Sequence, residues 1–531
     1  MSNVVVTGFM GTGKTAIGRE VARRLGRPFV DMDAEIEARA GKSISRIFAE
    51  DGEAAFREME AVLCRELSTR QGLVIATGGG TLVNPLNRAL MMRSGVVICL
   101  TCDVDEILRR ISRSGNSDRP LLNVPAPRDE IEQLLEVRRP AYQAIPWQVD
   151  TSKLSIEEAT ERVVEVAGVI TLPVRYPGGE YEIHIGAGLL AHVGGALRAA
   201  GVSEDGRVAV VCNPVVAPLY GPQVETALRK AGLQPFFCSI PDGEQHKTLA
   251  TVAALYEQFL AGGLDRSGTV LTLGGGVTGD VAGFAAATFM RGIRFAQVPT
   301  TLLAMVDASV GGKTGVDLPQ GKNLVGAFKQ PALVLIDPTV LATLPAEEFR
   351  SGLAEVIKHG LIGDPALFAE LEAVQHHLPL AVSGAQIARS LRVKIAVVEE
   401  DPFEQGRRAV LNLGHTVAHG LERLSGFTLR HGEAVSMGMV AAARIAVELK
   451  RADPVLVDRL EAALSAWGLP VRCPSFAVDT IWEAMAHDKK RRGRGLRWVL
   501  PRAIGQVELA EDVPPEVVRA ILCSMGARCE K

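Results

Sequence analysis

The chain has 531 residues, which is too long for one hydrophobic core, and this length predicts about three domains. With 47% hydrophobic and 22% charged residues it has the composition of a globular protein, and a net charge of −3 argues against a nucleic-acid partner. No apolar run reaches the ~18 residues of a membrane-spanning helix, and the eight scattered cysteines indicate free thiols in a reducing cytosol.

Roughly the first 170 residues alternate short apolar strands with helical patterns. Strands are predicted at residues 4–7, 28–31, 73–77, 96–100 and 148–150, and helices at 16–25 and 155–166. This alternation is typical of a parallel sheet covered by helices. We therefore expect an α/β domain of the nucleotide-kinase type over residues 1–168, with a short linker near 167–173.

Two further domains are predicted after the linker. Strands at 181–185, 207–212, 236–240, 269–273, 295–298 and 333–337 predict a Rossmann-like α/β domain over residues 173–345. Beyond residue 345 the strands fade, and helices are predicted at 347–362, 385–400, 411–424, 433–449 and 454–467. Residues 346–531 are therefore expected to form a mostly α-helical domain.

A phosphate-binding loop stands near the start of the chain. Residues 8–15, with the sequence GFMGTGKT, match GxxxxGK[ST] between a β-branched strand and a helical pattern. Lys14 can reach the β- and γ-phosphates, and the Thr15 hydroxyl can ligate Mg²⁺. The predicted ligand is ATP with Mg²⁺, held by Gly11, Thr12, Gly13, Lys14 and Thr15.

Carboxylates, glycines and arginines follow the later strands of this domain. Asp31 and Asp33 come after the second strand, where one can serve Mg²⁺ and the other a hydroxyl group, and residues 78–80 are glycines that let a ligand approach the backbone. The arginines are Arg57 on a predicted helix, Arg119 after a polar lid-like segment, and Arg138. This set predicts a small anionic acceptor that is phosphorylated on a hydroxyl group.

In order and spacing, these motifs resemble shikimate kinase over roughly residues 1–165. The resemblance implies that shikimate is bound by Asp33, Arg57, Gly79, Gly80 and Arg138, with the two guanidinium groups on its carboxylate. It also implies that Asp31 and Arg119 complete the ATP–Mg²⁺ site and that the catalytic residues are Lys14, Asp33 and Arg119. The alternative contacts for the adenine are Arg109, Arg110 and Arg113.

A second phosphate-binding turn is predicted at residues 271–280, LTLGGGVTGD, where a strand, a glycine turn and a helix start follow one another. Asp242, Glu244 and Lys247 follow an earlier strand, where the acids can bond ribose hydroxyls. Lysines 313 and 322 lie in a glycine-rich stretch that suits phosphate or carboxylate. The turn departs from GxGxxG, so by itself it supports a dinucleotide site only moderately.

Histidines cluster in the helical third of the chain. Four of the ten, at 359, 415, 419 and 431, fall within 73 residues, and Glu355 precedes His359 by one helical turn. Glutamate with two or three histidines is typical of a zinc-like site. Spacing alone favours His415 and His419 as a ligand pair, completed by His431 and either Glu355 or His359.

Roughly residues 173–531 resemble 3-dehydroquinate synthase throughout, from the DGExxK motif at 242–247 to HGEAV at 431–435. The resemblance implies a metal site of Glu355, His415 and His431, occupied by Zn²⁺ or Co²⁺, with His419 on the substrate side. It implies NAD⁺ contacts at Asp242, Gly243, Glu244, Lys247, Gly275, Gly276, Val277, Gly279, Asp280, Thr300, Thr301, Lys313 and Lys322. It implies substrate contacts at Arg291, Asp307, Asn323, Lys358, Lys394, Arg408, Asn412, His419 and Lys489 (or Lys490 beside it), with Lys313, Lys358 and His419 catalytic.

The two resemblances together imply a cytoplasmic two-enzyme fusion of the shikimate pathway. Its reactions would be the phosphorylation of shikimate by ATP and the conversion of 3-deoxy-D-arabino-heptulosonate 7-phosphate to 3-dehydroquinate. A homodimer through the synthase half is expected by resemblance only. The competing interpretations are a different sugar-phosphate cyclase or a metal-dependent polyol dehydrogenase for the second half. For the first half they are a gluconate or nucleotide kinase, or a docking module without activity.

Overall fold

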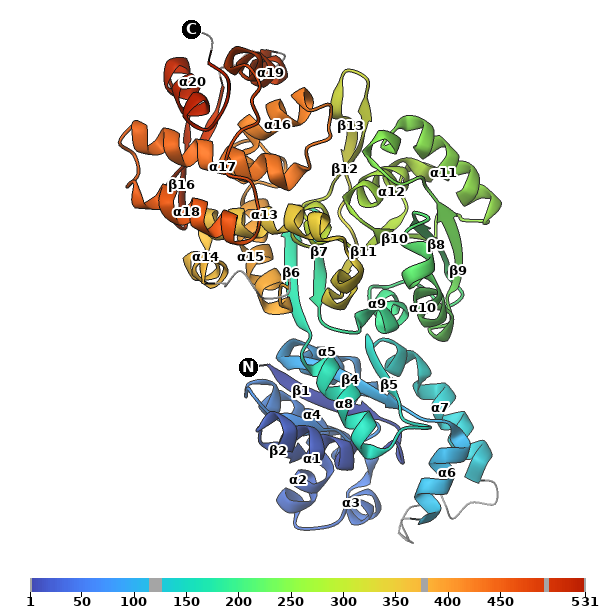
Figure 1. Ribbon diagram of the computed structural model, residues 1–531. Coiled ribbons are helices and arrows are strands. Elements are labelled where there is room, and N and C mark those ends of the chain that lie inside the picture. The colour runs from blue at the N-terminus through green and yellow to red at the C-terminus, as the bar shows by residue number, and fades with distance from the viewer. Residues whose placement is uncertain (1, 114–126, 374–380, 491–495, 530–531) are drawn as a thin grey trace. The chain divides into compact units, whose positions relative to one another are not determined.

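The computed structural model describes residues 2–113, 127–373, 381–490 and 496–529, with the backbone alone at 127 and 486–490 (Figure 1). The chain divides into two compact units. The first comprises Met1–Val169, Gly186–Arg207 and Tyr220–Pro235, and the second comprises Ile170–Ile185, Val208–Leu219 and Phe236–Lys531.

The first unit contains a five-stranded parallel sheet in the order β2-β3-β1-β4-β5. Its strands are β1 (Asn3–Gly8), β2 (Phe29–Asp31), β3 (Val74–Ala76), β4 (Gly95–Thr101) and β5 (Trp147–Asp150). All six residues of β1 are buried, because this strand lies at the centre of the sheet. The carboxyl ends of β1, β2 and β3 therefore meet at one edge, where the sequence carries its phosphate loop, acids and glycines.

Helices pack around this sheet (Figure 1). They are α1 (Lys14–Leu25), α2 (Met32–Ala40), α3 (Ile44–Glu50), α4 (Gly52–Ser68), α5 (Pro85–Ser94), α6 (Val104–Arg113), α7 (Pro127–Gln143) and α8 (Ile156–Ala167). The first unit also includes α9 (Val193–Ala199) and most of α10 (Ala217–Lys230). Capping residues fix several starts: Asp31 caps α2, and Ser155 with Glu158 forms a capping box on α8.

The second unit is built on a seven-stranded sheet in the order β6-β7-β14-β11-β10-β8-β9. Its strands are β6 (Ile170–Tyr176), β7 (Gly179–Ile185), β8 (Arg207–Cys212), β9 (Gln234–Ser239), β10 (Thr269–Gly274), β11 (Arg294–Pro299) and β14 (Leu333–Ile336). β6 runs antiparallel to β7, whereas β7, β14, β11, β10 and β8 are parallel neighbours. Helices α11 (Leu249–Ala261) and α12 (Gly276–Thr288) belong to this part of the fold.

Helices dominate the chain after residue 345. They are α13 (Ala346–Gly363), α14 (Pro365–Glu372), α15 (Gly384–Glu400), α16 (His415–Leu424), α17 (His431–Glu448), α18 (Val455–Ala466), α19 (Val478–Lys490) and α20 (Pro515–Ser524). α16 packs on α17, and α17 packs on α13, so the helix that begins at residue 346 lies against one that begins 85 residues later (Figure 1). The predicted fold class is confirmed: a parallel kinase-type sheet, a Rossmann-like sheet and a helical region.

Several predicted elements were wrong in detail. Residues 170–173, expected to be a linker, begin β6, because they pair with β7. The glycine-rich stretch at 313–328 is an antiparallel hairpin, β12 (Lys313–Leu318) and β13 (Gly321–Phe328). The helix expected at 411–424 is interrupted by Gly414, which has a φ of 80° and separates a 3₁₀ turn (Arg407–Asn412) from α16. The helical third also contains a strand pair, β15 (Trp498–Ala503) and β16 (Gln506–Ala510).

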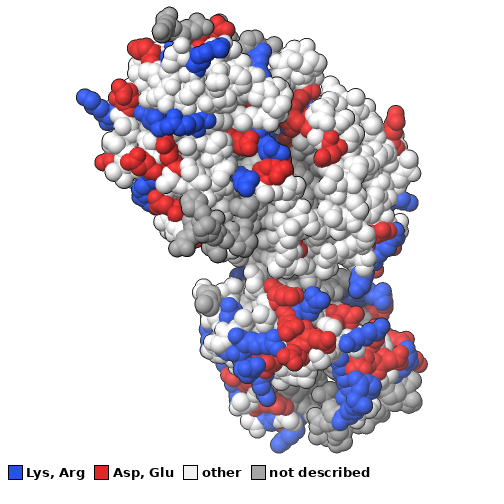
Figure 2. Space-filling view, in the orientation of Figure 1, with Lys and Arg blue, Asp and Glu red and all other residues white. Residues whose placement is uncertain are grey.

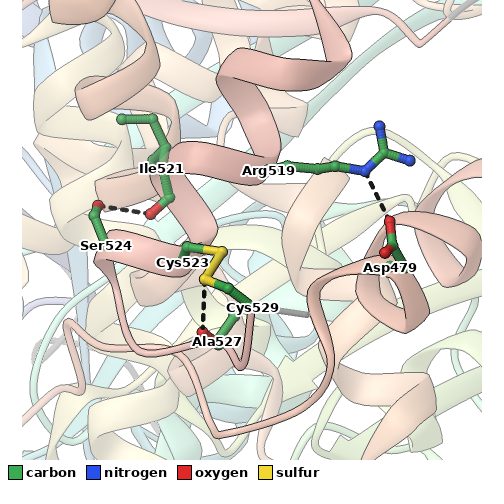
Figure 3. The surroundings of a disulfide bond; sticks show 7 residues. All are labelled: Asp479, Arg519, Ile521, Cys523, Ser524, Ala527 and Cys529. Carbon is green, nitrogen blue, oxygen red and sulfur yellow. Dashed lines mark hydrogen bonds and ion pairs between the residues drawn. A yellow bond between two sulfur atoms is a disulfide. The ribbon is translucent and has the colours of Figure 1, made fainter. Parts of the chain in front are cut away.

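The expectation of free thiols was wrong for two of the eight cysteines. A disulfide joins Cys523, in α20, to Cys529, six residues later (Figure 3). The six others, including Cys99 in β4 and Cys102 just after it, are free. Backbone bonds hold the looped segment to the residues before α19: the N–H of Cys473 donates to the carbonyl of Met525, and the N–H of Arg528 donates to that of Phe476. The disulfide therefore closes a loop that is already anchored at its base.

On the face of the first unit shown in Figure 2, basic and acidic side chains lie next to one another. Ion pairs of this unit include Arg39 with Glu66 and Arg46 with Glu50. Within the described ranges, no helix is both long and apolar enough to cross a membrane.

Candidate active sites

The phosphate loop has the geometry of an anion cradle. Gly11 and Gly13 have φ angles of 78° and 94°, which L-residues with side chains rarely adopt. Gly8 is packed so tightly that a Cβ there would lie 2.2 Å from the carbonyl oxygen of Leu100. Lys14 Nζ donates to the carbonyl of Phe9 at 3.0 Å. The loop therefore carries its lysine back over the turn, as phosphate binding at a helix N-terminus requires.

Two aspartates follow β2 and differ in their surroundings. Asp31 accepts a hydrogen bond from the Thr15 hydroxyl at 2.8 Å and caps α2, so the two predicted Mg²⁺-side groups touch each other. Asp33 lies in the first turn of α2 rather than on the strand. Burial raises the pKa of Asp33 to about 6, with Lys14 opposing this shift and Asp31 adding to it. A carboxylate with that pKa is ionised at neutral pH yet can still accept a proton.

The triple glycine after β3 is surrounded by the groups predicted to bind the acceptor. A Cβ on Gly78 would lie 2.7 Å from Asp33 Oδ1, and one on Gly80 would lie 2.6 Å from Arg57 Nη1. A Cβ on Gly79 would lie 3.5 Å from Arg138 Nη1. The structure therefore brings one carboxylate and two guanidinium groups to the same stretch of bare backbone.

Buried partners orient these arginines. Arg57 Nη1 donates to Glu60 at 2.8 Å, and Glu60, 1% exposed, also accepts from the Thr81 hydroxyl. The Arg138 guanidinium lies 5.3 Å from the centre of the Phe9 ring. Because these contacts restrict the side chains before a ligand arrives, less conformational entropy is lost on binding.

The three arginines that are candidate adenine contacts differ in their hydrogen-bond partners and exposure. Arg109 and Arg110 both pair with Glu106. Arg110 in addition donates to the carbonyl of Thr151 at 2.6 Å and approaches the carbonyl of Gly11 at 3.5 Å. Arg110 is thus the one tied to the phosphate loop, whereas Arg113 is exposed at the end of α6. Arg119 lies outside the described residues.

In the second unit, a glycine turn joins β10 to α12. Gly275 is the N-cap of α12 and offers no side-chain acceptor, so the first N–H groups of the helix, at Gly276 and Val277, remain available for a ligand. Thr300 N–H donates to the carbonyl of Gly274 at 3.0 Å, and a Cβ on Gly275 would lie 3.1 Å from Thr301. The predicted threonines therefore line the predicted turn, and the arrangement fits a pyrophosphate.

Lys247 ties three of the predicted NAD⁺ and substrate residues together. Its buried ammonium group lies 2.6 Å from Asp280 Oδ2 and donates to Asn323 Oδ1 at 2.5 Å. Lys322, beside Asn323 on β13, pairs with Glu244 at 3.2 Å. The hairpin β12–β13 thus closes against the residues that follow β9. Asp242 accepts a hydrogen bond from Asn213 Nδ2 at 2.6 Å on the same side of the sheet.

Three helices contribute one potential metal ligand each. Glu355 from α13, His415 from α16 and His431 from α17 have donor atoms within 4.8 Å of one another. The Nε2 atoms of the histidines lie 3.9 and 3.6 Å from Glu355 Oε1, beyond hydrogen-bond length. Ligands of a tetrahedral Zn²⁺ at ~2.0–2.2 Å stand roughly 3.3 Å apart, so the spacing is close to that of a coordination shell.

The surroundings of Glu355 favour a cation beside one of its oxygen atoms. The residue is fully buried, and its Oε2 forms an ion pair with the ammonium group of Lys358. Oε1, the oxygen nearest the two histidines, accepts no hydrogen bond from the described residues. Burial alone would raise the pKa of Glu355, but Lys358 and the two histidines hold this pKa well below its usual range. A buried carboxylate that remains ionised with one oxygen unpaired fits a divalent metal.

The remaining predicted ligand candidates have other partners. His419 stands one turn after His415, with the ring centres 5.5 Å apart, but is not part of the three-residue group. His359 is buried and its Nδ1 pairs with the Ser390 hydroxyl at 2.7 Å. A second group, Asp307, Glu355 and His359, shares Glu355 with the first. Lys358 and Lys394 both adjoin that second group, and their positive charges disfavour an additional metal there.

Two buried cationic side chains, Lys394 and Arg408, lie near Asp307. Lys394 Nζ donates to both the carbonyl oxygen and Oδ1 of Asp307, at 2.5 and 2.6 Å. Asp307 lies in a π-helical turn (Ala304–Ala308). Arg408 is 3% exposed and donates to the carbonyls of Pro402 and Gly311. Together with Lys313 and Lys358 they supply enough positive charge for a substrate with two anionic groups.

Glu404 was missed in the sequence and lies within this cationic set. Its carboxylate is 2.5 Å from Lys313 Nζ, and it has a positive φ of 59°. Burial would raise its pKa, but Lys313, Arg408 and a hydrogen bond to Asn412 lower it. Two predicted substrate residues, Arg408 and Asn412, and the predicted catalytic residue Lys313 therefore share one acidic partner. Nothing in the spacing of Asp401 to Gly406 signals this, because Lys313 is 91 residues away in the chain.

Arg291 and Lys489 complete the set of predicted substrate residues. Arg291 lies on an exposed turn between α12 and β11 with a φ of 69°, outside the contacts described above. The side chain of Lys489, like that of Lys490, lies outside the described residues.

Comparisons with known proteins match both units. Residues 10–167 match the family model of shikimate kinase, and residues 237–351 and 352–491 match the N- and C-terminal models of 3-dehydroquinate synthase. The 3-dehydroquinate synthases of a Synechocystis species and of Microcystis aeruginosa are 48% and 47% identical over 359 residues. The matches cover 66% of this chain and 99% and 98% of those proteins.

Two solved structures resemble the second unit. The 2-epi-5-epi-valiolone synthase of Streptomyces hygroscopicus, with NAD⁺ and Zn²⁺ bound, is 29% identical with a TM-score of 0.59, covering 65% of this chain and 96% of that one. A 2-deoxy-scyllo-inosose synthase complexed with carbaglucose-6-phosphate, NAD⁺ and Co²⁺ is 25% identical with a TM-score of 0.61, covering 67% and 100%. The chain belongs to the 3-dehydroquinate synthase family and joins to it a shikimate kinase domain, which makes it a bifunctional enzyme of the shikimate pathway.

Proposed function

We propose that the first unit transfers the γ-phosphoryl group of ATP to the 3-hydroxyl of shikimate. Lys14 binds the β- and γ-phosphates, while Thr15 and Asp31, already in contact, hold the Mg²⁺ side. Arg57 and Arg138 bind the shikimate carboxylate above the bare glycines. Asp33 orients the hydroxyl and accepts its proton, a role supported by its pKa of about 6.

The second unit, in this proposal, converts 3-deoxy-D-arabino-heptulosonate 7-phosphate to 3-dehydroquinate and releases phosphate. When bound, NAD⁺ takes up and returns a hydride, and the metal polarises substrate oxygens as a Lewis acid. Glu355, His415 and His431 hold the metal, and the first turn of α12 holds the pyrophosphate. The observation that carries the proposal is a fully buried carboxylate whose Oε1 accepts no hydrogen bond from the described residues and lies close to Nε2 of two histidines.

The side chains of this unit position the substrate and its protons. Lys394 and Arg408, both buried, present fixed positive charge to its carboxylate and phosphate. Lys358 stands one turn from Glu355 and pairs with its Oε2, so its ammonium group would lie beside the substrate hydroxyls that a metal held by Glu355 and the histidines would polarise. Holding a polyanion in one geometry favours the productive sequence of steps over side reactions.

We further propose that the domains are residues 1–168, 173–345 and 346–531, and that the enzyme is cytoplasmic and forms a homodimer through its synthase half. Light scattering of the full chain tests the dimer.

A paired assay on the full-length protein tests the two assignments. Lys14→Ala should abolish shikimate phosphorylation and leave 3-dehydroquinate formation intact, whereas His415→Ala should do the reverse. Chelation followed by Mg²⁺ alone should restore only the kinase reaction. The synthase product is identified by mass spectrometry, because another cyclase would give a different carbocycle. Full kinase activity in Lys14→Ala, or full synthase activity without divalent metal, would overturn the corresponding half.

A further inference from the structure

Glu422 is a buried carboxylate for which the reactions above provide no role. It lies on α16, seven residues after His415, so both residues occupy the same face of the helix two turns apart. It is 4% exposed. Burying a carboxylate costs several kcal/mol unless charged or hydrogen-bonding groups surround it. The partners of Glu422 therefore indicate what it does.

Its nearest partner is one of the two metal-site histidines. Glu422 Oε1 lies 3.3 Å from Nδ1 of His431, the first residue of α17. An ionised carboxylate can only accept a hydrogen bond, so Nδ1 must carry the proton and donate it. The other ring nitrogen, Nε2, is the one that lies 3.6 Å from Glu355.

The second histidine of the site is held in the same way by a different group. His415 Nδ1 lies 3.1 Å from the carbonyl oxygen of Leu413, which also can only accept. Both imidazoles are therefore anchored through Nδ1 and present Nε2 to Glu355. A backbone carbonyl cannot be removed by substitution, but the carboxylate of Glu422 can.

We propose that Glu422 is a positioning residue of the metal site, which fixes the orientation and tautomer of His431 by accepting its Nδ1–H. The inference rests on the proposed metal-dependent function of this unit. An imidazole held through one nitrogen by a carboxylate binds a metal more tightly through the other, because the ring is oriented in advance and its basicity is increased.

Glu422 also faces the dinucleotide side of the site. Its Oε1 is 3.9 Å from Lys322 Nζ, which pairs with Glu244 and stands 4.7 Å from the centre of the Phe427 ring. The ion pair with Lys322 is long and one-third exposed, so it contributes little. The contact with His431 is the closer and better shielded of the two, so the main effect of Glu422 is expected on the metal site.

The test is metal affinity in the full-length protein, measured by competition with a chromophoric chelator for Zn²⁺ and by the absorption spectrum of bound Co²⁺. Glu422→Gln should weaken binding about 10- to 100-fold, because a neutral amide accepts the Nδ1–H more weakly than a carboxylate and no longer increases the basicity of the ring. The matched control is Glu433→Gln, which removes a charge from the same helix as His431; among the described residues its carboxylate accepts a hydrogen bond from the backbone N–H of Arg430. It should leave the affinity within about twofold of wild type, which separates the contact with His431 from the loss of a charge alone.

Glu422→Asp provides a second variant if the glutamine form does not fold. It keeps the charge but shortens the side chain by one methylene, so it should also weaken binding and alter the Co²⁺ spectrum. Synthase activity of both variants should recover at saturating metal. Wild-type affinity in Glu422→Gln or Glu422→Asp would overturn the inference. A wild-type protein that binds no divalent metal at all would instead overturn the proposed synthase function.

Discussion

Replacing Asp33 with asparagine should abolish the kinase reaction and at the same time stabilise the first unit. Burial raises the pKa of Asp33 from 3.8 to about 6. Each pKa unit corresponds to ~1.4 kcal/mol, so ionising Asp33 in the folded chain costs about 3 kcal/mol. Asparagine has nearly the same shape and does not ionise. At pH 8 the variant should therefore be more stable by up to ~3 kcal/mol.

The sign of this effect depends on pH. Because the folded chain binds the Asp33 proton more tightly than the unfolded chain, this contribution to stability is complete below pH ~4 and is lost as the pH rises through about 6. Asp33→Asn and wild type should therefore have similar stability near pH 4 and diverge toward pH 8. In wild type, the kinase kcat/KM should fall below pH ~6 as the base becomes protonated.

The free energy of unfolding of each unit is measured by equilibrating the protein in urea and applying a short pulse of hydrogen–deuterium exchange. Mass spectrometry of peptides from each unit then reports their unfolding separately. The control is Asp129→Asn, which removes an exposed carboxylate of α7 and should change stability by less than ~0.5 kcal/mol at either pH. Equal or lower stability of Asp33→Asn at pH 8 would refute the argument, as would a gain that does not depend on pH. Retained shikimate phosphorylation would refute the role of Asp33 as base.

Three further predictions concern the second unit. Glu404→Gln removes the acidic partner of Lys313, so the KM of the anionic synthase substrate should fall about two- to fivefold, the equivalent of one partly exposed ion pair; an unchanged or higher KM would contradict this. Asp307→Asn leaves the buried ammonium group of Lys394 without its counter-charge, so it should lower the free energy of unfolding of the second unit by about 2–4 kcal/mol in the same urea experiment. Peptides from the first unit, which should be unaffected, are the internal control. Thiol titration of the denatured chain should find six reactive cysteines before reduction and eight afterwards; eight before reduction would exclude the Cys523–Cys529 bond.

Local sequence patterns were sufficient to predict the strand–turn–helix units that recur along the chain. Buried strands followed by glycine turns and helix starts, as at Gly8 and Gly275, have a spacing that backbone geometry alone dictates. The β12–β13 hairpin was missed because much of β13 is exposed and its composition is that of a loop. The break at Gly414 was missed because apolar periodicity continues across it, and only a φ of 80° reveals it.

The site residues also differ in whether the sequence could predict their partners. Residues adjoining a phosphate-binding turn could be located because the turn and its strand are consecutive in the chain. The partners of Lys313 and of Lys394 could not, since Glu404 and Asp307 are 91 and 87 residues away and are brought there by tertiary packing. Glu422 is intermediate: its separation of seven residues from His415 places it on the ligand-bearing face of α16, and this signal could have been recognised.

The π-helical turn at Ala304–Ala308 has a consequence for how this protein can vary between species. Its wide turn lets Asp307 present both its carbonyl and its side chain to Lys394. Deleting one residue there would restore ordinary helical spacing, rotate Asp307 by roughly 100° and shift the start of β12. Natural variants should therefore exchange residues within this turn but keep its length fixed, and insertions or deletions should accumulate in the surface loops instead.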